Sequence, residues 1–314
     1  MINALSGKTV LVTGASGFIG SHLLRRLKVI PEIKIIALTR KEIKQQEDAS
    51  LYWLSSSLQE LTPLFWKKNN IDHIDMIFHL GAFTPKSSHD ANNISAIYSD
   101  NLQGMRCLID GLPNVPERIL FASTLDVYAS PKNGTVLAEQ SPLGPISLYG
   151  ASKLFGEQLI KVYAEELKCS YSILRYGHIY GPGEIAYRKL IPETIRKLLT
   201  GQAPVIYGDG SSLRDFLFVD DAVEATLRAA THSLKQLGPI NIVRGESAPL
   251  REIVGHLISY SKQAIEPQYL LEKPNGESLR FDNQYMRKML GEWDMVPLLK
   301  GLELENDYFK QQAV

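Results

Sequence analysis

The sequence that decides the fold is Lys8-Thr9-Val10-Leu11-Val12-Thr13-Gly14-Ala15-Ser16-Gly17-Phe18-Ile19-Gly20. Its apolar first half predicts a short buried strand over 8–13, and its second half predicts a glycine turn followed by a helix over about 18–29. Gly14, Gly17 and Gly20 permit a tight turn and a close approach to a pyrophosphate, which the positive N-terminus of the helix would attract. A second strand follows at 34–38. This context favours a dinucleotide site over a flexible glycine loop.

Short apolar strands alternate with helical stretches along the first half of the chain. We expect strands near 8–13, 33–38, 51–54, 75–80, 118–122 and 171–175. This alternation predicts a Rossmann-type, doubly wound parallel sheet of the α/β class over residues 1–180. After Gly181-Pro182-Gly183 the pattern loosens, and residues 181–314 are expected to form mainly a smaller C-terminal α/β substrate-binding lobe. The ligand cleft should lie between the lobes, at the carboxyl ends of the strands.

The tip of the second strand reads Thr39-Arg40-Lys41, with no Asp or Glu before Glu42. An acid at this place binds a free ribose 2′-hydroxyl, whereas a base binds a 2′-phosphate. Arg40 can stack on adenine and form charge-assisted hydrogen bonds to the phosphate, so we expect NADP(H) to be favoured and NAD(H) to be possible. The alternative is that Arg40 is an ordinary surface arginine.

Tyr149 and Lys153 stand four residues apart in the run 147–153. On a helix this spacing places both side chains on one face, one turn apart. An adjacent cation favours a phenolate and lowers the pKa of a tyrosine, and a drop of roughly three units needs ~4 kcal/mol. The pair therefore predicts a tyrosine acid/base, although an accidental pair on a solvated helix face would show the same spacing.

Composition gives the chain no bias toward a polyanionic partner. Of 314 residues, 34 are Lys or Arg and 34 are Asp or Glu, and 44% are apolar. We expect no nucleic acid and no membrane as partners, because the net charge is balanced and no apolar stretch approaches ~18 residues. The N-terminus lacks the apolar region of a secretory signal, and the two cysteines are isolated, so a cytoplasmic enzyme without a metal site is expected.

With these residues in view, the chain resembles the extended short-chain dehydrogenase/reductase superfamily, in its nucleotide-sugar epimerase, dehydratase and reductase branch. The resemblance runs from Thr13 to about Leu290 and rests on motifs that occur in the order typical of the family. Besides the glycine turn and the Tyr149/Lys153 pair, these are His79-Leu80-Gly81-Ala82, Phe121-Ala122-Ser123-Thr124-Leu125-Asp126-Val127-Tyr128, Leu174-Arg175-Tyr176-Gly177-His178-Ile179-Tyr180-Gly181-Pro182-Gly183 and Tyr207-Gly208-Asp209-Gly210-Ser211-Ser212-Leu213-Arg214-Asp215-Phe216. Segments near 214–243 look like family segments that return to the first domain.

The resemblance implies a role for each matching residue. The expected catalytic residues are Thr124, Tyr149 and Lys153. The expected cofactor contacts are Gly14, Ser16, Gly17, Phe18, Ile19, Gly20, Thr39, Arg40, Leu80, Gly81, Ala82, Asn101, Ala122, Tyr149, Lys153, Tyr176, Gly177, His178 and Ile179. The expected substrate contacts are Thr124, Asp126, His178, Leu190, Tyr207 and Arg214. The substrate would be a nucleotide-diphosphate sugar, with Arg214 on the diphosphate, unless Arg214 forms a salt bridge to Asp209 or Asp215 instead.

Two departures from the family separate the possible reactions. Sugar 4,6-dehydratases have an adjacent Asp-Glu acid/base pair where this chain has Leu125-Asp126, and a leucine cannot protonate a leaving hydroxyl. Three roles are open for Asp126: a base, a hydrogen-bond acceptor for a sugar hydroxyl, or merely an acidic residue at the end of the strand. His178 replaces the asparagine usual in epimerases and dehydratases, which suits NADP-dependent reductases of 4-keto-deoxy sugars, although this histidine could equally pack beneath the turn.

These departures lead to an expected function with two alternatives. We expect reduction of a nucleotide-linked 4-keto deoxy sugar by NADPH, with Tyr149 as the acid. A 4-epimerase using the same residues in both directions is the first alternative, and a non-catalytic NADP(H)-binding sensor is the second. In this family, helices equivalent to 90–111 and 147–168 often form a homodimer interface, so a homodimer is expected.

Overall fold

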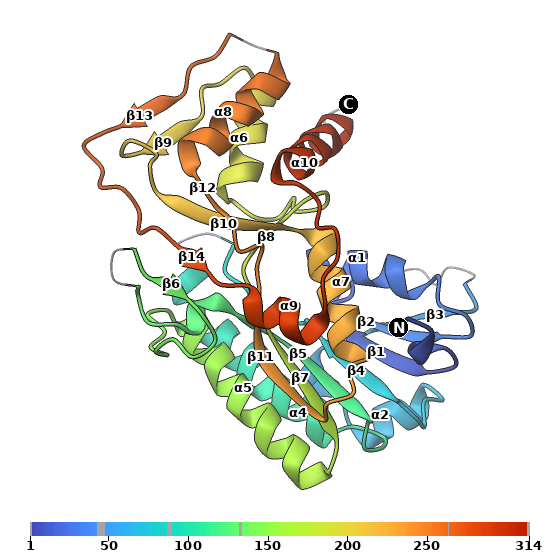
Figure 1. The fold of residues 1–314 in the computed structure, drawn as a ribbon. Coiled ribbons are helices and arrows are strands. Elements are labelled where there is room, and N and C mark those ends of the chain that lie inside the picture. The colour runs from blue at the N-terminus through green and yellow to red at the C-terminus, as the bar shows by residue number, and fades with distance from the viewer. Residues whose placement is uncertain (1, 43–47, 87–89, 132–133, 263, 313–314) are drawn as a thin grey trace.

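A computed structural model describes residues 2–42, 48–86, 90–131, 134–262 and 264–312. Its centre is a seven-stranded sheet in the order β11-β7-β5-β4-β1-β2-β3, with every neighbouring pair parallel (Figure 1). The strands are β1 (Thr9–Thr13), β2 (Lys34–Thr39), β3 (Leu51–Ser55), β4 (Met76–His79), β5 (Arg118–Thr124), β7 (Ser170–Tyr176) and β11 (Gln236–Ile242). The expected Rossmann-type fold is confirmed. Beside β7, β11 returns from the second half of the chain to complete the sheet.

Two hydrophobic layers cover the sheet because its central strands are apolar on both faces. One layer includes α1 (Phe18–Leu27) and α7 (Val219–Ala230). The other includes α2 (Pro63–Lys68), α4 (Gly104–Asp110) and α5 (Leu148–Leu167). The predicted helix over 90–111 is interrupted: η3 (Asp90–Asn92) and α3 (Ile94–Ala96) precede a π-helical turn, η4 (Ile97–Gln103), before α4 begins.

The second lobe lies above the carboxyl ends of the strands in Figure 1. Its sheet joins β8 (His178–Tyr180), β10 (Leu213–Phe218) and β12 (Ser247–Pro249), and β9 (Val205–Tyr207) pairs with β13 (Gln268–Leu270). The helices of this lobe are α6 (Leu190–Leu199), α8 (Leu250–Ser261) and α10 (Leu298–Gln312). Further elements are η1 (Ile2–Leu5), η2 (Leu58–Glu60), η5 (Leu125–Val127), β6 (Val136–Leu137), β14 (Arg280–Phe281) and α9 (Gln284–Leu290).

The two lobes are joined by pairing as well as by the chain itself. Strand β6, from the first half of the chain, pairs with β14, and Phe281 packs with Leu125, Val127 and Tyr128 in a small buried cluster. The turn after β5 is therefore held from both lobes. Among the described residues, no helix is long and apolar enough to cross a membrane.

Candidate active site

The site begins at the crevice between β1 and β4, where the order of the strands reverses. Such a switch point at the carboxyl ends is where open α/β sheets bind ligands. Gly14 follows β1 with φ +69, and a Cβ there would stand 2.8 Å from the backbone nitrogen of Gly81. The glycine turn and the segment after β4 are thus packed against each other, and Gly81 donates its amide to the Thr13 hydroxyl (2.9 Å).

Helix α1 presents a free N-terminus to this crevice. Its N-cap is Gly17, which offers no side-chain acceptor to the first amides of the helix, including those of Phe18 and Ile19. Unsatisfied amides at the positive end of a helix suit a phosphate group. The Ser16 hydroxyl is hydrogen-bonded to the Thr39 hydroxyl (2.8 Å), which ties the turn to the tip of β2.

Arg40, at the tip of β2, is already paired. Its Nη1 lies 2.7 Å from Oδ2 of Asp100, and 67% of the arginine side chain is exposed. Asp100 comes from the π-helical turn η4, sixty residues away in the sequence. A carboxylate beside the guanidinium neutralises the charge that a ribose 2′-phosphate would need and would itself repel that phosphate.

Asn101 joins the crevice to α5. Its Oδ1 accepts from the Phe83 amide (2.7 Å), and its Nδ2 donates to the Phe83 carbonyl (3.1 Å) and to the Ser152 hydroxyl (3.0 Å). The segment containing Leu80, Gly81 and Ala82 is therefore anchored to the helix with the predicted acid/base pair. Because Asn101 is buried and fully engaged, its role here is to hold these two segments together.

The predicted catalytic residues converge at the end of β5. Ser147 caps α5 by accepting from the Gly150 amide (3.0 Å), and Tyr149 is the second residue of the helix. Lys153 follows one turn later, 3% exposed, and its Nζ donates to the carbonyl of Ala122 on β5 (2.8 Å). The hydroxyls of Thr84 and Thr124 lie close enough to the Tyr149 hydroxyl to lower the pKa of the tyrosine.

The electrostatics of Tyr149 and Lys153 differ from the sequence prediction, in which the lysine lowers the pKa of the tyrosine. Burial raises the pKa of Tyr149 well above its ordinary value, with hydrogen bonds from Thr84 and Thr124 acting in the opposite direction. Burial also lowers the pKa of Lys153 to about 7. The lysine ammonium is directed to the Ala122 carbonyl and lies 4.8 Å from the Phe121 ring centroid. A phenolate at Tyr149 therefore needs a positive charge that the side chains alone do not provide.

The expected sugar-binding residues face a second group of charges. The pKa of the Asp126 carboxyl is raised because the surrounding protein desolvates it, and the nearby Lys189 ammonium only partly offsets this effect. The Lys189 ammonium is 2.8 Å from the buried Glu184 carboxylate and 4.5 Å from the Tyr187 ring centroid. The buried Nδ1 of His178 has no hydrogen-bond partner among the residues that the structure describes, and burial lowers the pKa of the ring to about 3, which favours the neutral imidazole.

Arg214 forms neither of the salt bridges considered for it. Its Nη1 donates to the carbonyls of Leu213 (2.9 Å) and Glu277. Asp215 instead accepts the amides of Arg244 and Gly245, and Asp209 accepts the Ser211 amide. With only carbonyl partners among the described residues, the guanidinium retains its positive charge for an anionic ligand.

Of the remaining predicted contacts, some have side chains that pack in the core and others border the site or are exposed. The Tyr176 ring lies in the core with its hydroxyl 2.5 Å from the Thr226 hydroxyl, so only its main chain could meet a cofactor. Ala122, Gly177 and Ile179 border the end of the sheet, and the side chain of Ile179 is also in the core. Leu190 begins α6 and packs on the core, whereas Tyr207 is exposed at the end of β9.

Sequence reasoning missed three side chains of this site, those of Thr84, Glu184 and Tyr187. Thr84 acts on the pKa values of both Tyr149 and Tyr187, so these three side chains lie close together. Glu184 forms the ion pair with Lys189 beside Asp126. A run of titratable residues just after Gly183 was the available signal for Glu184 and Tyr187.

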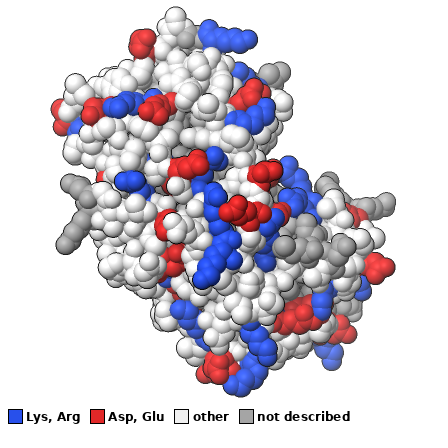
Figure 2. Space-filling model, viewed as in Figure 1, with Lys and Arg blue, Asp and Glu red and all other residues white. Residues whose placement is uncertain are grey.

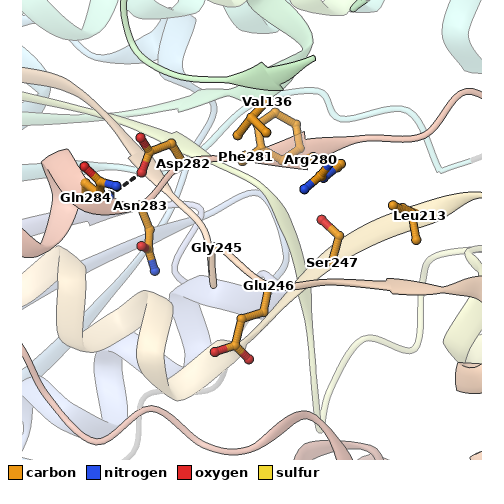
Figure 3. Close-up of a pocket in the computed structure, with 10 residues that line it drawn as sticks. All are labelled: Val136, Leu213, Gly245, Glu246, Ser247, Arg280, Phe281, Asp282, Asn283 and Gln284. Atoms are coloured by element: carbon orange, nitrogen blue, oxygen red, sulfur yellow. Dashed lines mark hydrogen bonds between the residues drawn. The ribbon is translucent and has the colours of Figure 1, made fainter. Parts of the chain in front are cut away.

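A separate cavity of about 730 Å³ lies between the lobes and is shown in Figure 3. It is lined by Val136, Leu213, Gly245, Glu246, Ser247, Arg280, Phe281, Asp282, Asn283 and Gln284. Leu213 and Arg214 are consecutive on β10, so their side chains point to opposite faces. None of Thr124, Tyr149 and Lys153 lines this cavity, and we place the chemistry in the crevice above β5.

Figure 2 shows the surface in the same view as Figure 1. Acidic and basic side chains are interspersed on the face that it shows.

Comparison with known proteins agrees with this geometry. Residues 10–242 match the NAD dependent epimerase/dehydratase family. The chain is 31% identical over 259 residues to the uncharacterized UDP-glucose epimerase YtcB of Bacillus subtilis, covering 78% of this chain and 79% of that protein. It is 26% identical over 328 residues to a dTDP-4-dehydro-6-deoxy-D-allose reductase of a Streptomyces species, covering 95% of each. The crystal structure of UDP-glucuronic acid 4-epimerase from Bacillus cereus with UDP-glucuronic acid and NAD superposes with a TM-score of 0.84 at 25% identity, covering 97% of this chain and 99% of that one.

Proposed function

The chain belongs to the NAD dependent epimerase/dehydratase family, and from this premise we propose that it is an NAD-dependent 4-epimerase of a UDP-linked sugar. The supporting observation is a complete Thr124, Tyr149 and Lys153 site combined with an Arg40 that Asp100 neutralises. This differs from our sequence prediction, in which Arg40 favoured NADP(H) and a 4-ketoreductase came first. The relatives named as UDP-sugar epimerases support the choice.

The residues of the crevice fit NAD. The amides at Phe18 and Ile19 would receive the pyrophosphate, because Gly17 leaves them without a cap. Thr39 and the Arg40–Asp100 pair would lie toward the adenosine ribose, where Asp100 offers a carboxylate to a free 2′-hydroxyl. Lys153, now hydrogen-bonded to Ala122, would approach the nicotinamide ribose. When bound there, NAD supplies a reversible hydride acceptor for C4 of the sugar.

Tyr149 would move the proton of the C4 hydroxyl in both directions. It takes this proton as C4 is oxidised to a ketone and returns it when the ketone is reduced on its other face. Thr124 hydrogen-bonds the same oxygen and stabilises the charge that develops on it. Because burial raises the pKa of Tyr149, the phenolate forms only once a positive charge is bound nearby, which confines the chemistry to the loaded site.

Two fixed cations would hold the diphosphate of the substrate. Arg214 has main-chain carbonyls as its partners, and Lys189 is oriented by Glu184. Charge-assisted hydrogen bonds to phosphate are worth roughly 1.5–3 kcal/mol each. His178, whose Nδ1 has no partner in the described part of the chain, can accept a hydrogen bond from the sugar or donate one to it, depending on its tautomer.

A 4-ketoreductase is the second candidate. It is favoured by His178 in place of the family asparagine and by the similarity to a 4-keto sugar reductase over 95% of the chain. The two functions differ in net redox change. Incubation with UDP-glucose and catalytic NAD should yield the C4 epimer, seen by proton NMR, with no net change in absorbance at 340 nm. Stoichiometric loss of NADPH with a 4-keto sugar, and no epimer from UDP-glucose, would establish the reductase instead.

We also propose that the enzyme is a homodimer that pairs through α5. Leu148, Phe155 and Val162 recur every seven residues on this helix, and 53% of Phe155 and 54% of Val162 are exposed. Tyr98, on the neighbouring η4 turn, is exposed as well. A stripe of this kind on two adjacent helical segments suits a second copy. Light scattering should give twice the mass of 35.1 kDa for the wild type and the monomer mass for Phe155→Glu.

A further inference from the structure

A buried ion pair lies behind the catalytic residues and takes no part in the chemistry described above. Glu157, on α5, is 0% exposed and is one turn beyond Lys153 and two turns beyond Tyr149. Its Oε1 accepts from Arg175 Nε (2.8 Å) and from the Ser123 hydroxyl (2.6 Å), and its Oε2 accepts from Arg175 Nη2 (2.7 Å). One carboxylate thus connects α5 with β5 and β7.

Arg175 extends the connection to Tyr128, the residue that follows the η5 turn. Its Nη1 donates to the Tyr128 hydroxyl (2.9 Å), and its guanidinium carbon lies 4.9 Å from the Tyr128 ring centroid. The Tyr128 hydroxyl in turn donates to Oδ1 of Asn241 on β11 (2.7 Å). Ser123 immediately precedes Thr124, and Tyr128 immediately follows the η5 turn, so the pair holds the segment containing Thr124 at both of its ends.

Three successive residues of β5 contact three residues of α5, and these contacts fix where the helix lies along the strand. Gly156 lies against Phe121, because a Cβ there would stand 2.6 Å from the ring. Lys153 donates to the Ala122 carbonyl and Glu157 accepts from Ser123, the next residue on the strand. The apolar contact alone would allow α5 to slide or rotate slightly, whereas the bidentate pair has one geometry.

We propose that the Glu157–Arg175 pair is a positioning device, which fixes α5 on β5 and thereby sets the place of Tyr149 relative to Thr124. This inference rests on the proposed function. A buried ion pair contributes little net stability compared with apolar residues of similar volume, and its clearest use is to specify one arrangement. Glu157 and Arg175 are 0% and 2% exposed, so we expect them to act on catalysis only through Thr124, Tyr149 and Lys153.

The test removes both charges at once, because removing one would leave an uncompensated buried charge. In the double variant Glu157→Met/Arg175→Met the protein should stay folded and keep its NAD. Its kcat should fall about tenfold to a hundredfold, as expected for a misplacement of the reacting groups by up to ~1 Å, while its KM for the UDP-sugar changes by less than about threefold. An unchanged kcat in the folded double variant would overturn the inference.

Arg118→Met is the matched control. Like Arg175, Arg118 is a buried arginine, but it lies at the start of β5, at the opposite end of that strand from Ser123. It donates to the carbonyls of Tyr171, His232 and Leu234 and to the Ser172 hydroxyl. Its loss should lower stability and leave kcat unchanged. An equal fall of kcat in this control would show that the effect of the double variant is merely structural, and would also overturn the inference.

Two further measurements separate this inference from the proposed function and from a failure to fold. Backbone amides of residues 149–157 should exchange hydrogen faster in the double variant than in the wild type or in Arg118→Met, whether or not any sugar is turned over. Equal exchange would refute the inference, whereas absence of epimerisation in the wild type would refute only the proposed function.

A second variant covers the case in which the double variant fails to fold. Tyr128→Phe removes the hydrogen bonds of the Tyr128 hydroxyl to Arg175 and Asn241 without leaving a buried charge, and it should lower kcat about twofold to fivefold. A wild-type kcat in that variant would count against the inference.

Discussion

Replacing Lys153 by methionine should stabilise the ligand-free protein at neutral pH while abolishing activity. Lys153 is 3% exposed, and burial lowers the pKa of its ammonium from 10.5 to about 7. Between these two values the unfolded chain binds a proton that the folded protein does not, so folding stability rises with pH. The cost of burying this lysine is complete below about pH 7 and is lost as the pH approaches 10.5.

The magnitude follows from the same two pKa values. At ~1.4 kcal/mol per pH unit the full cost is roughly 5 kcal/mol. Methionine removes this cost but leaves the Ala122 carbonyl, which Lys153 now satisfies, without a donor, and an unsatisfied buried acceptor costs about 1–3 kcal/mol. The net gain at pH 7 should therefore be about 2–4 kcal/mol, and it should shrink with pH and change sign before pH 10.5.

Urea unfolding of nucleotide-stripped wild type and Lys153→Met at pH 7, 8, 9 and 10 measures this difference. The control is Lys161→Met. Lys161 lies on the same helix but is not buried, so this variant separates the effect of burying a lysine from the general effect of losing a positive charge. The free-energy difference between Lys153→Met and wild type should decrease by ~1.4 kcal/mol per pH unit over most of this range. A difference that does not change with pH would refute the assignment of Lys153 as a buried amine of low pKa.

Three further predictions concern the proposed catalytic and binding roles. Tyr149→Phe should retain NAD and lose about a thousandfold or more in kcat, which steady-state kinetics and the absorbance of the bound nucleotide will show; unchanged activity would exclude an acid/base role. Arg214→Ala should raise KM for the UDP-sugar by about tenfold or more, which corresponds to a loss of ~1.4 kcal/mol or more of diphosphate binding, and kcat should stay within threefold of the wild-type value. An unchanged KM would show that the diphosphate binds elsewhere. Asp100→Asn should release Arg40 and shift the ratio of the Kd values for NAD and NADP toward NADP by about tenfold in a fluorescence titration, whereas an unaltered ratio would show that Asp100 does not set the cofactor preference.

The features predicted correctly from the sequence are those encoded over a few residues. The run from Lys8 to Gly20 predicts a strand, a turn and a helix because apolar spacing and glycines act locally, and Tyr149 and Lys153 share a face of α5 because of their spacing. The pairing of Arg40 with Asp100 escaped prediction because it joins residues sixty positions apart, and nothing in the spacing of Glu157 and Arg175 indicates that they meet.

Helix α10 was not predicted from the sequence, for a different reason. Its buried face consists of Gly301, Leu302, Glu305, Asn306 and Phe309. A glutamate and an asparagine occupy two core positions, so the apolar period that marks an amphipathic helix is broken in the sequence. Burial raises the pKa of Glu305 well above its ordinary value, which favours the neutral form of this side chain in the core.

The most direct test of the account is the fate of hydrogen at C4 of the substrate. UDP-glucose deuterated at C4 is incubated with the enzyme and a catalytic amount of NAD, and the product is analysed by NMR and mass spectrometry. A 4-epimerase predicts an epimer that retains the deuterium at C4, with no net oxidation or reduction of the nucleotide. Loss of the deuterium to solvent, or conversion only of a 4-keto sugar with stoichiometric consumption of NADPH, would contradict it.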